Sequence, residues 1–369
     1  MAFSNIFSRP ARLVLSATVF LSLAQAHTVM TTLYVDGENQ GDGVCIRMNM
    51  DGYTSNYFVS PVTSKDIACG VDGEKGVSRV CPAKTSSVLT FEFREDADDV
   101  NSRPLDESHK GPAAVYMKKV SSATDSNNAA GDGWFKIWES VYDSENDKWG
   151  TTKMIENNGH ISVRVPEDIE GGYYLVRTEL LALHAATANP PDPQFYVGCA
   201  QVFIESNVTN PSRPETVFIG EGTYTLDNPA LTFNIYDKPM ALPYPPLGPP
   251  VYKPKSNPDT TEGNSQEQTE GLKPEGCIFV NGNWCGFEVP SYNNEEECWA
   301  ASDDCWRQSD NCWAETQPTG YGYCTEWSKK CEEISDSCKN SRFPGPPNAG
   351  QDITPEWKKL EEGGTEIFY

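Results

Sequence analysis

The strongest constraint on the fold of this chain is the spacing of cysteines near its C-terminal end. Two groups of three recur at seven-residue intervals, namely Cys298, Cys305 and Cys312, and then Cys324, Cys331 and Cys338. Seven residues are nearly two turns of an α-helix, so each group lines one face of a helix. The segment 317–321, with the sequence QPTGY, predicts a turn between the two helices.

An antiparallel arrangement of these helices determines how the six cysteines pair. The expected pairs are centred on Pro318 within the turn, and they are Cys298–Cys338, Cys305–Cys331 and Cys312–Cys324. Cys277 and Cys285 flank the hairpin signal Asn281-Gly282 and are predicted to close it. Residues 277–338 are therefore predicted to form a small disulfide-stapled helical hairpin. Disulfides must supply much of its stability, because so small a module buries little apolar surface.

The N-terminal residues predict export to a compartment where such disulfides form. Arg9 and Arg12 precede a short apolar run over 13–23 and the small-residue site Ala24-Gln25-Ala26. These are the three parts of a secretory signal peptide over residues 1–26, and the run is shorter than the ~20 residues that span a bilayer. The mature protein is expected to be secreted, extracellular and to begin at His27. The sequon at Asn207 predicts a glycosylation site.

Residues 27–252 predict an all-β domain. Short stretches alternate between apolar and polar residues and are separated by Gly, Pro, Asn and Asp; examples are 87–93, 160–165 and 231–236. This pattern is typical of an immunoglobulin-like antiparallel β-sandwich with long loops. Residues 253–276 are rich in Pro, Lys, Glu, Ser and Thr and are predicted to be a disordered linker. Residues 339–369 are predicted to be a polar tail.

The charge of the chain restricts its partners. A formal net charge of −24 argues against nucleic acid and against an anionic membrane. A neutral polysaccharide is compatible with this charge, although an acidic surface also serves solubility alone. The protein is expected to act as a monomer.

The histidines suggest a copper site. The chain has only four, and cleavage after the signal peptide would turn His27 into the N-terminal residue. A free α-amine and an imidazole on one residue form a bidentate chelate. A second imidazole completes a T-shaped set of three nitrogens, which favours copper. His109, in the polar turn 106–112, is the candidate for that second imidazole.

A predicted strand over 194–201 carries further candidates. Gln194 and Tyr196 lie on one face of this strand because successive side chains alternate. Tyr196 can offer a weak axial oxygen to a metal. His184 and Gln194 can hydrogen-bond a metal-bound oxygen species. The structural alternatives are core packing for Tyr196 and a buried hydrogen-bonded pair for His184 and Gln194.

Four segments of the chain, taken together, resemble the fungal lytic polysaccharide monooxygenases of auxiliary activity family 9, formerly family 61 glycoside hydrolases. They are 27–29 (HTV), 108–112 (SHKGP), 172–184 (GYYLVRTELLALH) and 194–199 (QFYVGC). The resemblance covers residues 27 to about 252 and not the C-terminal module. Two features depart from it: Thr178 stands where many members carry histidine, and the loop between His184 and Gln194 is one residue longer.

The resemblance implies roles for individual residues. His27 and His109 would form the histidine brace around one copper ion, with Tyr196 as the axial residue. His184 and Gln194 would be the outer-sphere pair. Tyr244 would lie on the flat substrate-binding face. The disulfides implied for this domain are Cys69–Cys199 and, by what remains, Cys45–Cys81.

The resemblance also implies an activity. Copper reduced by an external electron donor would activate O2 or H2O2, and hydrogen would be abstracted from C1 or C4 of a β-1,4-glucan such as cellulose. Hydroxylation of that carbon then breaks the glycosidic bond. The alternatives are a non-catalytic copper- or glycan-binding cell-wall protein that retains the brace and, with less support, a hydrolase.

Three tryptophans in the C-terminal module leave two alternatives. Trp299, Trp306 and Trp313 each follow a cysteine of the first helix and form a stripe with a spacing of about 10.5 Å, near the two-sugar repeat of a cellulose chain. They either bind a glucan or pack against the Cys277–Cys285 hairpin as a miniature core. The second alternative is favoured, because the module has little else that is apolar to bury.

Overall fold

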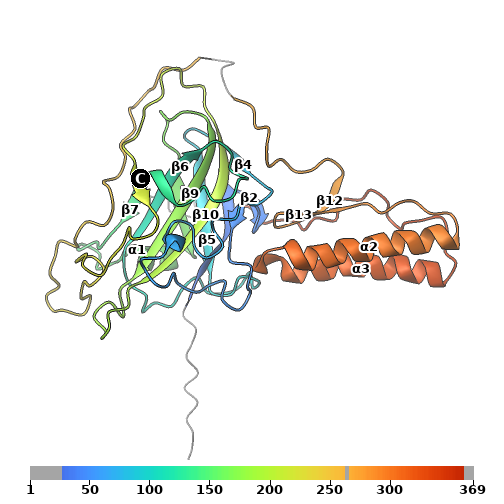
Figure 1. The fold of residues 1–369 in the computed structure, drawn as a ribbon, viewed down its shortest axis with the longest axis horizontal. Helices are drawn as coiled ribbons and strands as arrows, with labels where there is room; N and C mark the ends of the chain where they lie inside the picture. Colours follow the sequence, from blue (N-terminus) through green and yellow to red (C-terminus); the bar gives the residue numbers. More distant parts are fainter. Residues whose placement is uncertain (1–26, 262–265, 361–369) are drawn as a thin grey trace, which may run out of the picture.

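The computed structural model describes residues 27–261 and 266–360, and it consists of a β-sandwich with a helical arm (Figure 1). The predicted all-β fold class is confirmed, as is the appended helical hairpin. The predicted signal peptide over 1–26 lies outside the described residues. Within the described ranges, no helix combines the length and the apolarity that a membrane crossing requires.

The first sheet of the sandwich has four strands in the order β2-β1-β5-β8. They are β1 (Val29–Val35), β2 (Glu38–Asp42), β5 (Val88–Arg94) and β8 (His160–Arg164), and all neighbours pair antiparallel. Strands β5 and β8 follow the alternation seen in the sequence, and their inward residues Phe91 and Ile161 are fully buried. Strand β1 begins two residues after His27, so the pairing of β1 with β5 fixes the position of that histidine.

The second sheet has the order β11-β7-β6-β9-β10-β3, and β4 pairs in parallel with β10. Its strands are β3 (Ile46–Arg47), β4 (Cys81–Lys84), β6 (Ala113–Val120), β7 (Gly131–Ser140), β9 (Gly172–Ala182), β10 (Gln194–Glu205) and β11 (Val217–Ile219). The long pairing of β9 with β10 sets Gln194 opposite Ala182 and Tyr196 opposite Leu180. A short helix α1 (Gly150–Glu156) and a 3-10 turn (Lys65–Ile67) lie in the connections.

The stretch 231–236, predicted to be a strand, is not one. Leu231 and Phe233 are buried as the alternation suggested, but the side chain of Asn234 accepts a hydrogen bond from the backbone N–H of Tyr236. Such a turn diverts the backbone from strand pairing. The alternation here reflects burial of a loop against the second sheet, not a sheet register.

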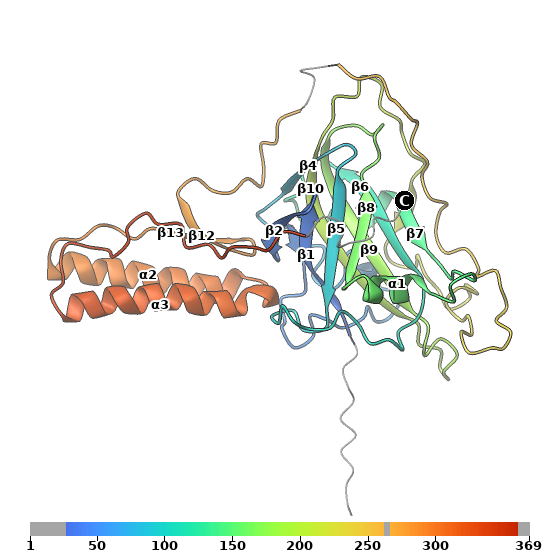
Figure 2. The ribbon, with the colours of Figure 1, turned by 180° about the vertical axis from the view of Figure 1, so that it is seen from behind.

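The C-terminal module forms the arm. It contains a two-stranded sheet of β12 (Cys277–Asn281) and β13 (Trp284–Phe287), then α2 (Glu295–Glu315), a 3-10 turn (Pro318–Gly320) and α3 (Tyr321–Lys339). The side chain of Asn294 caps α2 by accepting from the N–H of Glu297. Both views show α2 and α3 side by side, projecting from the sandwich across the direction of its strands (Figures 1 and 2).

Six disulfides hold the two parts. The structure contains the four pairs expected in the module, including all three cross-links between α2 and α3, and the two pairs expected in the sandwich. No cysteine is left unpaired in the described chain. Because three cross-links follow one another along the helix pair, the arm is held as a unit.

The described parts of the segment 253–276 are ordered against the sandwich, in contrast to the disordered linker expected there. The Tyr173 hydroxyl accepts hydrogen bonds from the backbone N–H groups of Thr269 and Glu270. The Glu270 carboxylate accepts from Ser122, and Val80 bonds the carbonyl of Gly271. The polar residues of this segment thus form hydrogen bonds with the sandwich.

Candidate copper site

Three rings from distant parts of the chain converge at one end of the sandwich. The ring centroids of His27 and Tyr196 are 6.2 Å apart, and those of His109 and Tyr196 are 6.0 Å apart. His27 precedes β1, His109 precedes β6 and Tyr196 lies in β10. The residues that the sequence predicted as a metal-binding set therefore lie together.

His27 is held by its neighbour on the chain. The Thr28 hydroxyl donates to the carbonyl of Pro104 at 2.5 Å, and Thr28 itself is buried. The His27 ring stacks on Tyr57 with centroids 4.7 Å apart. Its Nδ1 atom is buried and has no hydrogen-bond partner. Nδ1 of His184 and Nδ1 of His160 share this state, but only Nδ1 of His27 lies on the residue that would also supply an amine. An unpartnered nitrogen can bind a metal without breaking a hydrogen bond.

His109 sits in a tight turn that packs on β9. Its backbone N–H donates to the carbonyl of Asp106, and its Nδ1 lies 3.2 Å from the Ser108 hydroxyl. Two residues on, Gly111 approaches the Leu181 carbonyl so closely that a Cβ at this position would collide with it. The glycine in the SHKGP segment thus allows the turn to lie directly on β9, which places the His109 ring.

Tyr196 and Gln194 project from the same face of β10, as alternation predicted. The Tyr196 hydroxyl donates to Oε1 of Gln194 at 2.9 Å, and Nε2 of Gln194 donates to Asp192 at 3.1 Å. Tyr196 is buried, and this burial raises the pKa of its hydroxyl. The hydroxyl therefore stays protonated and neutral.

His184 follows the end of β9, and its ring lies 4.1 Å from the ring of His109. Burial, followed by the nearby charge of His184, lowers the pKa of His109 to about 4 and lowers that of His27. Burial also lowers the pKa of His184. The lowered pKa values favour the neutral imidazole, which is the protonation state in which a ring nitrogen binds a metal.

No group of three or more His, Cys, Asp or Glu suited to an ion occurs in the ranges 27–261 and 266–360. A histidine brace does not require such a group. Its three nitrogens come from two imidazoles and one N-terminal amine. In the full chain the α-nitrogen of His27 is bonded to Ala26. The third nitrogen becomes an amine only after cleavage at that bond.

Tyr244 does not lie where the resemblance suggested. Its side chain is only 8% exposed, and its hydroxyl donates to the carbonyl of Ala230. Its ring packs edge-on against Trp149 and Phe233. The expectation that Tyr244 contacts substrate is therefore wrong, because its side chain is part of the hydrophobic core. Tyr236 from the same segment is exposed and donates to the backbone carbonyl of His184.

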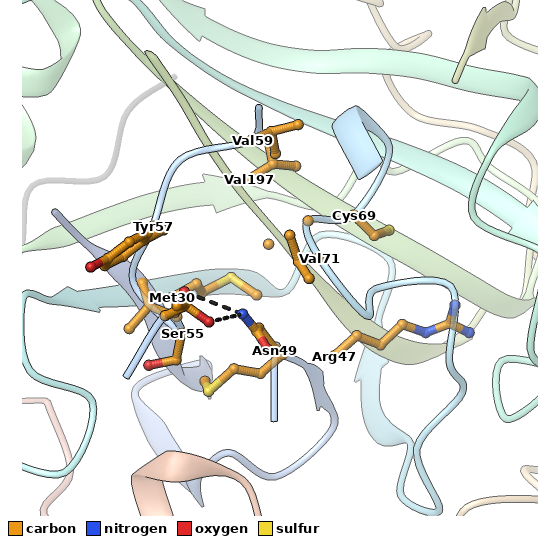
Figure 3. Close-up of a pocket in the computed structure, with 14 residues that line it drawn as sticks. Met30, Arg47, Asn49, Ser55, Tyr57, Val59, Cys69, Val71 and Val197 are labelled. Atoms are coloured by element: carbon orange, nitrogen blue, oxygen red, sulfur yellow. Dashed lines mark hydrogen bonds between the residues drawn. The ribbon is translucent and has the colours of Figure 1, made fainter. Parts of the chain in front are cut away.

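Sequence reasoning missed two tyrosines beside the site. Tyr53 and Tyr57 lie in the polar loop after β3, with ring centroids 6.2 Å apart, and Tyr53 is strongly exposed. The Asn49 amide braces this loop through Thr54, and a cavity of about 30 Å³ lies behind it (Figure 3). That volume suits a water molecule and not a sugar. The sequence signal that could have identified these two residues is the presence of aromatic side chains in an otherwise polar loop.

The two departures from the family pattern differ in their contacts with the site. Thr178 is buried in β9, where its hydroxyl contacts Met30 and the carbonyl of Gly198. The longer loop after His184 closes on itself through a hydrogen bond from Asp192 N–H to the Ala185 carbonyl. The carboxylate of the same Asp192 then reaches Gln194.

Comparison with known proteins decides the family. The family model described as Auxiliary Activity family 9 (formerly GH61) matches residues 27–244. This chain belongs to that family. It is accordingly an oxidoreductase of the copper-dependent lytic polysaccharide monooxygenase class, and the family acts on polysaccharides and consists of secreted fungal enzymes. The non-catalytic alternative and the hydrolase are thereby set aside.

Relatives of this family member differ in whether they share its arm. An AA9 family lytic polysaccharide monooxygenase C of Aspergillus tamarii is 58% identical over 351 residues, which cover 94% of each chain. An AA9 family lytic polysaccharide monooxygenase A of Emericella nidulans is 53% identical and covers 95% of this chain and 61% of its own length. The solved structure of CvAA9A, at 30% identity and a TM-score of 0.54, matches 98% of its own length but 61% of this chain.

Proposed function

We propose that cleavage before His27 completes a site for one copper ion. The ligands would be the α-amine and Nδ1 of His27 and Nε2 of His109, with the Tyr196 hydroxyl as a weaker donor. The observation that carries this assignment is the buried, unpartnered Nδ1 of His27 beside the other two rings. Export through the signal peptide over 1–26 is part of the proposal, as is a glycan on the exposed Asn207.

The donor set fits copper. An α-amine and Nδ1 of the same histidine close a six-membered ring with a metal, whereas Nε2 points away from the amine. His109 keeps Nε2 for the metal because its Nδ1 faces the Ser108 hydroxyl. Three neutral nitrogens in a tetragonal arrangement favour Cu(II) over the other divalent ions. A protonated tyrosine hydroxyl would be a weak donor to the ion.

Bound copper supplies the one-electron and oxygen chemistry, with O2 or H2O2 as co-substrate and an external electron donor. The protein's own residues position and protect this chemistry. Asp192 orients the Gln194 amide, and Gln194 orients the Tyr196 hydroxyl. His184, close to His109, can offer a hydrogen bond to an oxygen co-substrate. These are the roles that we assign to the outer residues.

The substrate that we propose is cellulose or a related β-1,4-glucan, oxidised at C1, at C4 or at both. Three exposed tyrosines lie beside the candidate metal site: Tyr57 stacks on His27, Tyr53 lies next to Tyr57, and Tyr236 donates to the carbonyl of His184. Aromatic faces stack on the apolar faces of sugar rings. A net charge of −24 disfavours anionic polymers.

The test uses the secreted, full-length protein acting as a monomer. N-terminal analysis should return His27, and copper-loaded protein should give an axial Cu(II) paramagnetic resonance spectrum with nitrogen couplings. Oxidised oligosaccharides should appear from cellulose only when a reductant such as ascorbate is present. A variant with one alanine inserted between Ala26 and His27 is the matched control. Equal product release by this variant would contradict the proposed ligand set.

A further inference from the structure

The tryptophans of α2 are placed unlike the other tryptophans of this protein. Trp299 and Trp313 are 37% and 47% exposed, and all nine tryptophans lie in the described ranges, where no other is exposed to this degree. Trp306, between them, is half-buried, and its Nε1 donates to the Ser335 hydroxyl on α3. Exposed large aromatic residues in a row usually mark a binding surface.

Trp299 and Trp313 are not in the core of the module, which was the favoured alternative, whereas the half-buried Trp306 packs against that core. That core is built from other rings: Phe279, Trp284 and Trp327 lie 5.5 to 6.3 Å from one another. The two-stranded sheet meets α2 through Gln308, whose amide bonds the backbone of Phe287. Trp306 is two residues from Gln308 and so lies on nearly the opposite side of the helix. The sheet therefore covers one side of the helix pair, and the tryptophans line the other.

The spacing of the tryptophans matches a repeating ligand. Seven residues separate successive rings, which is about 10.5 Å along the axis, and the stripe drifts by only ~20° for each interval. A β-1,4-glucan chain presents the same sugar face once every two sugars, at nearly this interval. A rigid helix can thus offer stacking positions in register with one extended chain.

The charge of α2 narrows the class of polymer. The helix carries seven acidic residues and one basic residue, Arg307. An anionic polysaccharide or nucleic acid would be repelled by such a surface. A neutral chain, bound by stacking, would not be repelled.

The stripe is continuous with the face that carries the candidate copper site. The rings of Trp313 and Tyr321 lie 6.3 Å apart. Tyr321 lies against Gly52, where a Cβ would come within 2.9 Å of the ring, and its hydroxyl donates to the carbonyl of Met50. Tyr53 follows directly, and its ring leads to Tyr57. Ring contacts therefore join Trp313 to Tyr321, and Tyr53 to the Tyr57 ring that stacks on His27, and the backbone of Gly52 lies between the two pairs.

The arm is fixed to the sandwich by polar contacts at its inner end. The Asn283 side chain accepts from the N–H of Cys45 and donates to the carbonyl of Gly43. Gln317 donates to the carbonyl of Ile46. At the last of the described residues, the backbone N–H of Leu360 bonds the carbonyl of Gly37. The stripe thus keeps a set orientation to the copper face, unlike a module on a flexible tether.

We propose that Trp299, Trp306 and Trp313 form a second stacking site for a neutral β-1,4-glucan, held rigidly beside the copper face. The inference deepens the proposed function and rests on it for the identity of the polymer. Binding along the arm holds the enzyme on the glucan surface near the carbon to be oxidised. Binding along the arm also determines the direction in which the glucan chain crosses the copper site.

The test compares variants of the full-length, copper-loaded protein without reductant, by depletion onto microcrystalline cellulose. The double variant Trp299→Ala/Trp313→Ala should lose about 10-fold in partition coefficient, since each exposed ring contributes modestly. Phe287→Ala is the matched control, because Phe287 is 41% exposed on the sheet side of the module. It should bind like the wild type, and Trp299→Phe/Trp313→Phe should recover part of the loss.

Equal binding by the double variant and the wild type would overturn the proposal, as would an equal loss in Phe287→Ala. Binding of the wild type to chitin but not to cellulose would overturn it as well. The copper spectrum separates this outcome from failure of the proposed function: it should be the same in all of these variants. If binding depends on the tryptophans but the protein forms no oxidised product, the second stacking site is supported and the proposed oxidative function is contradicted.

Discussion

The hydroxyl of Tyr196 donates a 2.9 Å hydrogen bond to Gln194, so the predicted axial residue and the predicted outer-sphere amide act as one unit. Asp192 extends the unit by accepting from the same amide. Because the amide oxygen accepts from the phenol, the phenol cannot turn its proton elsewhere. A lone pair on the Tyr196 oxygen would then remain available to a metal ion.

Replacing Gln194 with alanine should lower the rate of oxidised-product release by about 10- to 100-fold, which is the usual effect of removing a partner of a metal-binding group. Copper affinity should change far less, since no nitrogen ligand is lost. Calorimetric titration with Cu(II) and product analysis at saturating reductant measure the two quantities. Asp192→Asn is a milder variant, and we expect its rate of product release to lie between those of the wild type and Gln194→Ala. An unchanged rate in Gln194→Ala would show that the amide is only structural.

Gly111→Ala should weaken copper binding although Gly111 is not a ligand. A Cβ at this position collides with the Leu181 carbonyl, so the turn carrying His109 must move away from β9. We expect at least a 10-fold loss of copper affinity and a stability loss of roughly 1–3 kcal/mol, typical of an overpacked site. Gly322→Ala is the control, because a Cβ at Gly322 would meet only ordinary contacts, the nearest at 3.5 Å from Asp98. Retention of wild-type copper affinity in Gly111→Ala would contradict this account of how His109 is placed.

The sequence predicted what depends on regular spacing and local pattern. Seven-residue intervals predicted α2, α3 and their cross-links, and alternation predicted β5, β8 and the shared face of Gln194 and Tyr196. Tyr244 was misassigned because a sequence motif does not show whether a ring in a loop turns inward. The stretch 231–236 alternates like a strand but turns at Asn234.

The sequence pattern could not predict long-range contacts. Nothing local to Asn283 indicates that its amide meets the backbone of Gly43, 240 residues away. The same applies to the meeting of Tyr321 with Gly52. These contacts depend on how two separately folded parts dock, and docking is determined by surface shape more than by residue type.

Asn283→Ala should loosen the arm without unfolding either part. The change removes both hydrogen bonds that tie the sheet of the module to the loop before β3, at a cost of about 1–2 kcal/mol at the interface. Hydrogen exchange of the amide of Cys45 should speed up, and small-angle scattering should indicate a wider range of arm positions. The main thermal transition of the sandwich should stay within a few degrees of the wild type. Unaltered exchange at Cys45 would show that other contacts hold the arm alone.

The stability of the sandwich should depend on acid through Glu92. Burial raises the pKa of this carboxyl, but His160, the Arg94 guanidinium and the Tyr34 hydroxyl together hold it at about 2. The unfolded chain binds a proton at this residue near pH 4.5, so between the two values the unfolded state carries more protons. The stabilising contribution is therefore complete above pH 4.5 and is lost as the pH falls through 2.

Glu92→Gln should remove this contribution. At pH 7 the free energy of unfolding should fall by roughly 3 kcal/mol, because the amide cannot replace an ionised acceptor for Arg94. The difference from the wild type should shrink steadily as the pH is lowered from 4.5 towards 2, where the native carboxyl is itself protonated. Denaturant unfolding at a series of pH values measures both curves, and Glu221→Gln in an exposed loop is the control. A difference that stays constant over this range would mean that the lost stability comes from packing and not from the charge of Glu92.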